Sequence, residues 1–341
     1  MMRSIFVALF LCFAAGLANA QIETSVGVEH AATLDTGTGV LHGTIMAPAR
    51  EAAVSIVILI AGSGPTDRNG NTLGLPGVND SLKLLAKALA ASGIASLRYD
   101  KRGVGESRTA GPKESDLRFE MYVADAAMWV RQLKADRRFS TVTVLGHSEG
   151  SLIGMLAVEN SGADAFISVA GVARRASDLL RDQLRPKLSG ELAQQNEQLL
   201  ASLEQGKFIG TVPAALMALY RPSVQPYLAS WMRYTPAEAI KKLSVPVLIV
   251  QGTTDAQVGV AEAEALKHSR PEAEIAIVNG MNHVLKTVPV DPTKQQASYV
   301  DPALPVAPEL VDRVRAFVLA IGPLPIVKNP GYDNSNANRR Q

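Results

Sequence analysis

This sequence of 341 residues has a single cysteine, almost no net charge and few long apolar runs. Its one cysteine, Cys12, lies within the first 20 residues. If that segment is removed, the mature chain has no thiol, which excludes a cysteine nucleophile, a cysteine-bound metal and a disulfide framework. The 34 basic and 32 acidic residues nearly balance, so charge gives no reason to expect nucleic-acid binding. We expect a soluble globular protein without a metal, a cofactor or, after residue 20, a membrane span.

The first 20 residues are typical of a secretory signal peptide. A basic residue, Arg3, precedes the apolar run Ile5–Leu17, and Ala18-Asn19-Ala20 ends the segment in a small-x-small pattern. An uncleaved signal anchor is the alternative, but the run is shorter than the roughly 20 residues needed to span a bilayer. We therefore predict cleavage after Ala20 and a periplasmic or extracellular protein that begins at Gln21.

Short apolar runs alternate with helical patterns along the rest of the chain. Six runs are too short for helices and rich in Val and Ile, as buried parallel strands are. They are Val54–Ile60, Ile94–Tyr99, Val142–Leu145, Phe166–Ala170, Val247–Val250 and Ile275–Val278. Apolar positions recur at helical spacing in Ser81–Ser92, in Arg118–Lys134 and from Leu310 to Ile321. This alternation predicts an α/β fold in which helices cover both faces of a mostly parallel sheet. At its start, Val26–Pro48 is predicted to form an antiparallel hairpin.

Residues 172–243 break the alternation, because they contain helical patterns but no strand pattern. An all-helical insertion between two parallel strands must stand at one edge of the strand ends, so we predict a cap. The core then comprises residues 21–171 and 244–325, and a disordered polar tail is expected over 326–341. Four large cap side chains could line a pocket, although packing in the core is the preferred interpretation: Met217, Tyr220, Trp231 and Met232.

The most specific motif is Gly146-His147-Ser148-Glu149-Gly150, which follows a predicted strand and precedes a helical pattern. In this setting Gly-x-Ser-x-Gly forms a sharp turn that exposes a nucleophilic serine at the end of the strand. Larger side chains in place of the two glycines would collide with neighbouring backbone. The alternative is an ordinary strand-to-helix turn with a buried serine. We predict that Ser148 is the nucleophile.

A serine hydroxyl needs a base within hydrogen-bond reach and a third group that orients the base. Among the five histidines, His283 alone lies in a loop after a predicted strand. His30 and His42 fall in the predicted hairpin, and His268 falls in a charged helical segment. His147 directly precedes the serine, so its ring must point away from it at the turn. We therefore predict His283 as the base.

Asp255 follows another predicted strand, so its carboxylate can accept a hydrogen bond from the far ring nitrogen of His283. A solvated turn aspartate is the alternative. The order Ser148, Asp255, His283 along the chain is the order that the α/β-hydrolase fold requires.

Two backbone N–H groups should stabilise the negative charge that develops on the substrate oxygen. One is predicted to be that of Glu149, and the other that of Ser63 in the glycine-containing stretch Ala61–Gly70. That stretch could also be only a glycine-rich turn. It lacks Gly-x-Gly-x-x-Gly, so no dinucleotide is expected there. The charged stretch Arg98–Ser107 is predicted to be an internal, salt-bridged scaffold.

Five sequence blocks together resemble bacterial α/β hydrolases of the serine aminopeptidase-like or esterase-like kind. They are Gly-Ser-Gly-Pro-Thr-Asp-Arg-Asn-Gly at 62–70, Arg-Tyr-Asp-Lys-Arg-Gly-Val-Gly-Glu-Ser at 98–107, Gly-His-Ser-Glu-Gly at 146–150, Gly-Thr-Thr-Asp at 252–255 and Gly-Met-Asn-His at 280–283. The resemblance covers nearly the whole mature chain and implies hydrolysis of an ester, a thioester or an amide. Ala61 departs from it, because many members carry histidine before the oxyanion glycine.

Three functions follow as hypotheses, each with a small-molecule ester or peptide as the partner. The first is a carboxylic-ester or thioester hydrolase that forms an acyl-enzyme on Ser148. The second is a serine aminopeptidase for small peptides, which would need an acidic cap residue to hold the substrate amine; the candidates are Glu191, Glu197 and Glu204. The third is a binding protein that kept the fold and lost catalysis, against which the complete set of three residues in the correct order argues.

Overall fold

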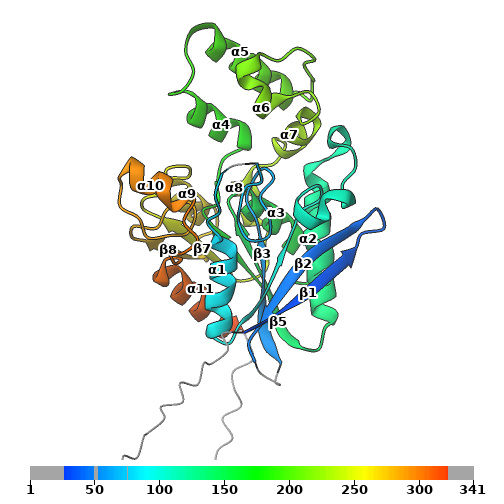
Figure 1. Cartoon of the computed structure of the whole chain (residues 1–341), viewed down its shortest axis with the longest axis vertical. Helices are drawn as coiled ribbons and strands as arrows, with labels where there is room; N and C mark the ends of the chain where they lie inside the picture. The colour runs from blue at the N-terminus through cyan, green and yellow to red at the C-terminus, as the bar shows by residue number, and fades with distance from the viewer. Residues whose placement is uncertain (1–26, 50–52, 75, 322–341) are drawn as a thin grey trace, which may run out of the picture.

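The computed structural model describes residues 27–49, 53–74 and 76–321 (Figure 1). The predicted signal peptide and the predicted tail from 326 to 341 lie outside the described residues.

In the described ranges, eight strands form one sheet in the order β1-β2-β4-β3-β5-β6-β7-β8. The strands are β1 (Val28–Asp35), β2 (Val40–Ala47), β3 (Val54–Ile60), β4 (Ala95–Tyr99), β5 (Phe139–His147), β6 (Ala165–Val169), β7 (Val247–Gly252) and β8 (Glu274–Val278). β1 and β2 form the predicted hairpin, and β2 pairs antiparallel with β4. All other neighbours are parallel. The six predicted core strands are all present, and only β5 is markedly longer than predicted, because its ends also pair with β3 and β6.

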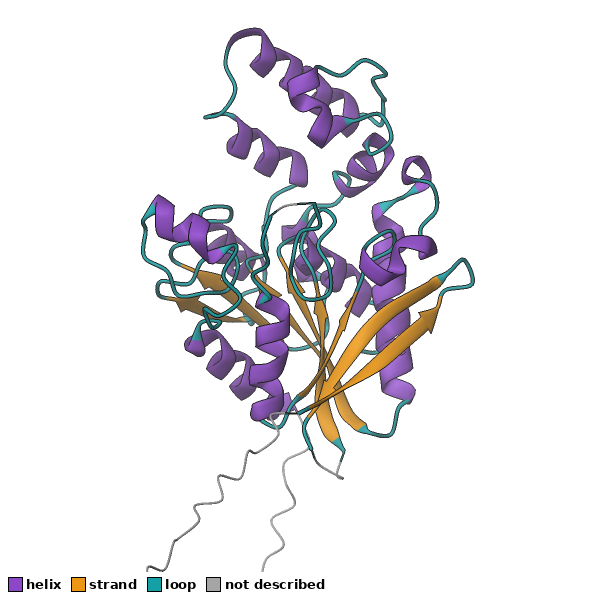
Figure 2. Cartoon of the chain, in the orientation of Figure 1, coloured by secondary structure: helices purple, strands orange, loops and turns teal. Residues whose placement is uncertain are grey.

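Helices cover both faces of the sheet, as predicted (Figure 2). α1 (Ser81–Ala91) and α11 (Pro308–Ile321) cover one face, and α2 (Phe119–Ala135), α3 (Glu149–Val158) and α9 (Val260–Ser269) cover the other. The apolar positions that predicted α1, Leu82, Leu85 and Leu89, are all buried. α3 is buried on almost every side, because it packs between the sheet, α2 and α8 (Pro236–Lys241). The remaining short elements outside the insertion are η1 (Gly105–Ala110), η2 (Glu114–Asp116) and α10 (Pro292–Ser298).

Between β6 and β7 the chain forms only helices: α4 (Ala176–Leu184), α5 (Gly190–Glu204), η3 (Ala214–Leu216), α6 (Met217–Tyr220), α7 (Gln225–Trp231) and α8. Figure 1 shows α4 to α7 standing above one end of the sheet, whereas α8 packs beside α3 and α9. We call residues 176–231 the cap. No helix in the described part of the chain has the length and apolar character to cross a membrane.

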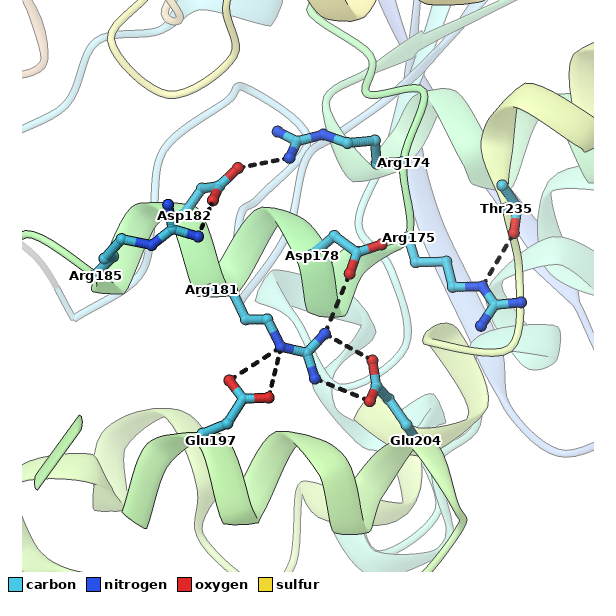
Figure 3. A network of polar contacts seen from close by, with 9 residues as sticks. All are labelled: Arg174, Arg175, Asp178, Arg181, Asp182, Arg185, Glu197, Glu204 and Thr235. Atoms are coloured by element: carbon cyan, nitrogen blue, oxygen red, sulfur yellow. Dashed lines mark hydrogen bonds and ion pairs between the residues drawn. The ribbon is translucent and has the colours of Figure 1, made fainter. Parts of the chain in front are cut away.

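Arg181 on α4 holds the two longest cap helices together (Figure 3). Its guanidinium lies 2.9 Å from Glu197 and 2.8 Å from Glu204, both on α5. Just before the cap, Arg174 contacts Asp182 of α4 and Glu262 of α9, the latter at 2.6 Å. Ion pairs therefore connect α4 and α5 within the cap, and Arg174, just before the cap, connects α4 to α9 of the core.

Candidate active site

Ser148 lies in a sharp turn between β5 and α3. Its φ of 55° and ψ of −120° are rare for a residue other than glycine, and such a conformation costs about 1–3 kcal/mol. A Cβ added to Gly146 would lie 2.1 Å from the Gly150 carbonyl oxygen, and one added to Gly150 would lie 2.3 Å from the Ile60 oxygen. The steric requirement for both glycines, predicted from the sequence, is confirmed.

Asp255 and His283 are in direct contact, although β7 and β8 deliver them from separate loops. The Asp255 Oδ2 atom lies 2.8 Å from His283 Nδ1. Its Oδ1 atom accepts hydrogen bonds from the backbone N–H groups of Gln257 (2.8 Å) and Val258 (2.9 Å). Burial alone would raise the pKa of Asp255, but the His283 ring and these amides outweigh it and lower the pKa. The carboxylate therefore stays ionised and orients the imidazole.

His147 points away from the cavity beside Ser148 and into the protein, as predicted. Its Nε2 atom lies 2.8 Å from the His283 carbonyl oxygen, and the two imidazole rings are 4.8 Å apart. Burial, together with the neighbouring His283, lowers the pKa of His147 to about 3. A neutral His147 thus donates its Nε2–H to the loop that carries His283.

Ser148 and His283 are brought to the same region by this contact, because His147 directly precedes Ser148. Among the described residues, the Ser148 hydroxyl makes no hydrogen bond to the His283 ring. Such bonds often become short only in the complex with substrate. The structure thus joins Asp255 to His283 directly and Ser148 to His283 through the neighbouring residue.

The loop after β3 lies against the nucleophile. A Cβ added to Gly62 would lie 3.3 Å from the Ser148 Cβ, a tight contact that a neighbouring group would have to relieve by moving a few tenths of an ångström. Ser63 and Glu149 border the same cavity as Ser148. Within the described part of the chain, neither backbone N–H donates to another protein group. The two predicted oxyanion donors therefore remain available beside the serine.

The charged stretch 98–107 forms an internal scaffold for this loop, as predicted. Asp100 accepts hydrogen bonds from the backbone N–H of Arg68 (2.7 Å) and of Glu106 (3.0 Å). Arg102 forms a two-pronged contact with Asp125 of α2, at 2.6 and 2.7 Å. These buried contacts hold β4, α2 and the loop after β3 in one arrangement.

Lys101 in the same stretch has contacts that sequence reasoning missed. Its Nζ atom donates to the Gly62 carbonyl oxygen (2.6 Å) and to Glu149 Oε2 (2.8 Å). The hydroxyl of Tyr227, on α7 of the cap, donates to the other Glu149 oxygen at 2.5 Å. Two sequence signals could have pointed to Lys101: its position just after a predicted strand, and its place in the block 98–107 that resembles the family.

A cavity of about 290 Å³ separates Ser148 from the cap. Side chains on and beside α4 and α7 give it apolar walls: Val172, Leu179, Leu180, Leu219, Val224, Leu228 and Trp231. Of the four large residues considered above, Trp231 does both: it lines this cavity and also packs against the core, where its ring stacks on that of Phe119 at 6.1 Å. Tyr220 and Met232 are buried in the core, and Met217 is 40% exposed.

The three acidic cap residues considered for amine binding are all outside the cavity wall. Glu197 and Glu204 pair with Arg181, and Glu191 accepts a hydrogen bond from Gln195 at 2.9 Å. Among the described residues, no cluster of three or more Cys, His, Asp or Glu side chains is arranged to hold a metal ion.

Known proteins resemble this chain in both sequence and fold. A family model described as serine aminopeptidase, S33, matches residues 74–287. The esterase EstD of Thermotoga maritima is 31% identical over 263 residues, which cover 75% of this chain and 61% of the esterase. The chain thus spans less than two thirds of that relative's length.

Two solved structures share the fold at 16% sequence identity. Est1E from Butyrivibrio proteoclasticus has a TM-score of 0.55, and the match covers 85% of this chain and 99% of Est1E. The proline iminopeptidase of Mycobacterium smegmatis has a TM-score of 0.56, and the match covers 86% of this chain and 98% of the iminopeptidase. Together with the family match and the geometry of the turn at Ser148, these likenesses show that the chain belongs to the serine aminopeptidase (S33) family of α/β hydrolases.

Proposed function

We propose that this protein is an exported serine esterase that cleaves carboxylic esters or thioesters through an acyl-enzyme on Ser148. The observation that carries the proposal is the apolar cavity of about 290 Å³ that opens directly at Ser148. Apolar walls suit the hydrocarbon part of an acyl group, since each buried CH₂ contributes about 0.8 kcal/mol. The volume lies just below the roughly 300–1,000 Å³ that is typical of small-molecule sites, which favours a short or medium acyl chain.

In the proposed reaction, the Ser148 Oγ attacks the acyl carbonyl while His283 Nε2 takes its proton. Asp255 holds the opposite ring nitrogen and stabilises the imidazolium. The carbonyl oxygen becomes negatively charged and accepts hydrogen bonds from the N–H groups of Ser63 and Glu149. The C–O or C–S bond then breaks as His283 protonates the leaving group. Water, activated by His283, releases the acid from Ser148 by the same steps in reverse.

An ester is favoured over a peptide because an aminopeptidase must bind a cationic substrate amine. Among the residues that the structure describes, Glu149 is the one acidic residue that borders the cavity, and its two oxygens are occupied by Lys101 and Tyr227. Burying an ammonium group without a partner costs roughly several kcal/mol, even after the surrounding protein relaxes around it. A free amine would therefore be poorly tolerated beside Ser148.

Purified protein assayed on p-nitrophenyl esters of graded chain length, alongside aminoacyl arylamides, tests the proposal. We expect ester turnover, with an optimum at short or medium chains, that disappears in Ser148→Ala. Release of arylamine without ester turnover would replace the esterase with an aminopeptidase. A fluorophosphonate probe separates both from a binding protein, because only an activated Ser148 reacts with it.

The proposed location depends on the N-terminal segment, which lies outside the described residues. We expect the mature protein in the periplasmic or culture fraction, with Gln21 at its N-terminus. Edman sequencing or intact mass of protein from each fraction tests this. A full-length chain retained in the membrane fraction would instead indicate an uncleaved signal anchor.

A further inference from the structure

A buried ion pair beside the nucleophile has no part in the reaction proposed above. The side chains of Lys101 and Glu149 are each 1% exposed and lie 2.8 Å apart. Removing two charges from water is costly, and apolar residues of similar volume often stabilise a protein as well or better. Stability alone therefore gives little reason for an ion pair at this position.

The second contact of Lys101 indicates what the pair does. The Gly62 carbonyl, which Lys101 holds at 2.6 Å, belongs to the same peptide unit as the Ser63 N–H. A trans peptide is planar, so its N–H points opposite to its C=O. By holding the Gly62 oxygen on one side, Lys101 fixes the direction of the Ser63 N–H on the opposite side of that peptide. Ser63 and Ser148 border the same cavity, so this direction matters for a substrate oxygen bound there.

The same ammonium also fixes the side chain of Glu149, whose own N–H is the second oxyanion donor. One cation therefore ties together the two segments that supply both donors, the loop after β3 and the first residue of α3. The Lys101 Nζ atom thus contacts one group 39 residues before it in the sequence, on Gly62, and another 48 residues after it, on Glu149. Oxyanion stabilisation depends on donors that are held in place before the charge develops.

Tyr227 extends this arrangement into the cap. Its hydroxyl donates to Glu149 Oε1 at 2.5 Å, and its ring packs 6.2 Å from that of Phe119 on α2. The hydroxyl can reach Glu149 only when α7 is docked on the core. Both carboxylate oxygens of Glu149 are thus satisfied only in the docked arrangement.

We propose that Lys101 is a positioning residue that sets the orientation of both oxyanion donors, and that Tyr227 makes this arrangement depend on a docked cap. The inference rests on the proposed esterase function. Lys101 touches no reacting atom; it acts through the Gly62–Ser63 peptide and through Glu149.

The cap part is tested with Tyr227→Phe and a matched control, Tyr234→Phe. Tyr234 follows the cap in sequence, and its hydroxyl also donates a hydrogen bond to the core, to Glu120 Oε1 at 2.9 Å. Unlike Tyr227, it does not border the cavity. We expect Tyr227→Phe to lower kcat about tenfold with KM little changed, and Tyr234→Phe to leave kcat within twofold. Equal losses in both variants would show that only general cap attachment matters and would overturn this part.

The Lys101 part is tested with Lys101→Met and with Lys101→Met combined with Glu149→Gln. The single variant leaves a buried carboxylate without its cation and is expected to lower Tm. The double variant removes that charge and should recover Tm, but it still lacks the contact on Gly62. We expect kcat of the double variant to stay about 10- to 100-fold below wild type, less than the 10²–10³ of deleting a donor outright.

Affinity for a trifluoromethyl ketone, whose hydrate or adduct oxygen occupies the oxyanion position, should fall by the same factor as kcat. Recovery of both kcat and this affinity in the double variant would overturn the proposal, since Lys101 would then only balance a charge. Wild-type protein that hydrolyses no ester would refute the proposed function instead. The rate of fluorophosphonate labelling of Ser148 still measures the effect of Lys101 in that case, because the phosphoryl oxygen uses the same donors.

Discussion

Replacing Asp255 with asparagine changes one atom at the place where the proposed chemistry is most sensitive. In the structure, Asp255 Oδ1 accepts two backbone N–H groups, from Gln257 and Val258, while Oδ2 faces His283 Nδ1 at 2.8 Å. An asparagine amide cannot turn its NH₂ toward the two backbone donors without opposing like groups. Its oxygen therefore stays at the Oδ1 position, and its NH₂ faces the histidine.

That orientation forces the wrong tautomer on His283. Nδ1 must then accept a hydrogen bond, so the ring proton moves to Nε2, and Nε2 can no longer take a proton from Ser148. In serine proteases the same substitution lowers kcat about 10⁴-fold. At 1.36 kcal/mol per tenfold change, this corresponds to about 5.4 kcal/mol of transition-state stabilisation.

The assay is hydrolysis of p-nitrophenyl butyrate by wild type and Asp255→Asn, with thermal unfolding measured on the same samples. We expect kcat to fall by three to four orders of magnitude, on the order of the loss above, with a small change in Tm. A folded variant with kcat within tenfold of wild type would refute the role given to Asp255.

Four further predictions concern the loop, the cap, the cavity and pH. Gly62→Ala places a methyl 3.3 Å from the Ser148 Cβ and should lower kcat roughly tenfold by displacing the loop, whereas Gly210→Ala, which meets open space, should not; equal kcat in the two variants would contradict this. Arg181→Met removes the ion pairs between α4 and α5, each worth about 0–1 kcal/mol, so protease cleavage within the cap should accelerate and KM should rise; unchanged cleavage would argue against this clamp. Trp231→Ala enlarges the cavity, and kcat/KM for longer acyl chains should rise about fourfold per added CH₂ until it is filled; an unchanged chain-length profile would place the acyl group elsewhere. Because the pKa of Asp255 is lowered from 3.8 in the folded state, its ionised form adds stability above that pH and loses it as the pH falls through the lowered value. The Tm difference between wild type and Asp255→Asn should therefore shrink below pH 3.8, and a difference that grows there would reverse the sign.

Local features were predictable from the sequence because their causes lie within a few residues. Runs of Val and Ile too short for helices identified the core strands, and β3 was predicted to the residue. The turn at Ser148 was predictable because two glycines are required by contacts made within the motif and with the adjoining strand. The order of Ser148, Asp255 and His283 followed from loops after strands; their catalytic roles stay predictions.

Only the tertiary structure decided which distant groups meet. Lys101 looked like any cation in a charged loop until β4 lay beside β3 and brought it to Gly62 and Glu149. Trp231 and Met232 are neighbours in sequence, yet one lines the cavity and the other is buried, because this depends on how α7 docks on the core. Contacts between segments far apart in the chain are set by packing of whole elements, and no local pattern of residue types encodes them.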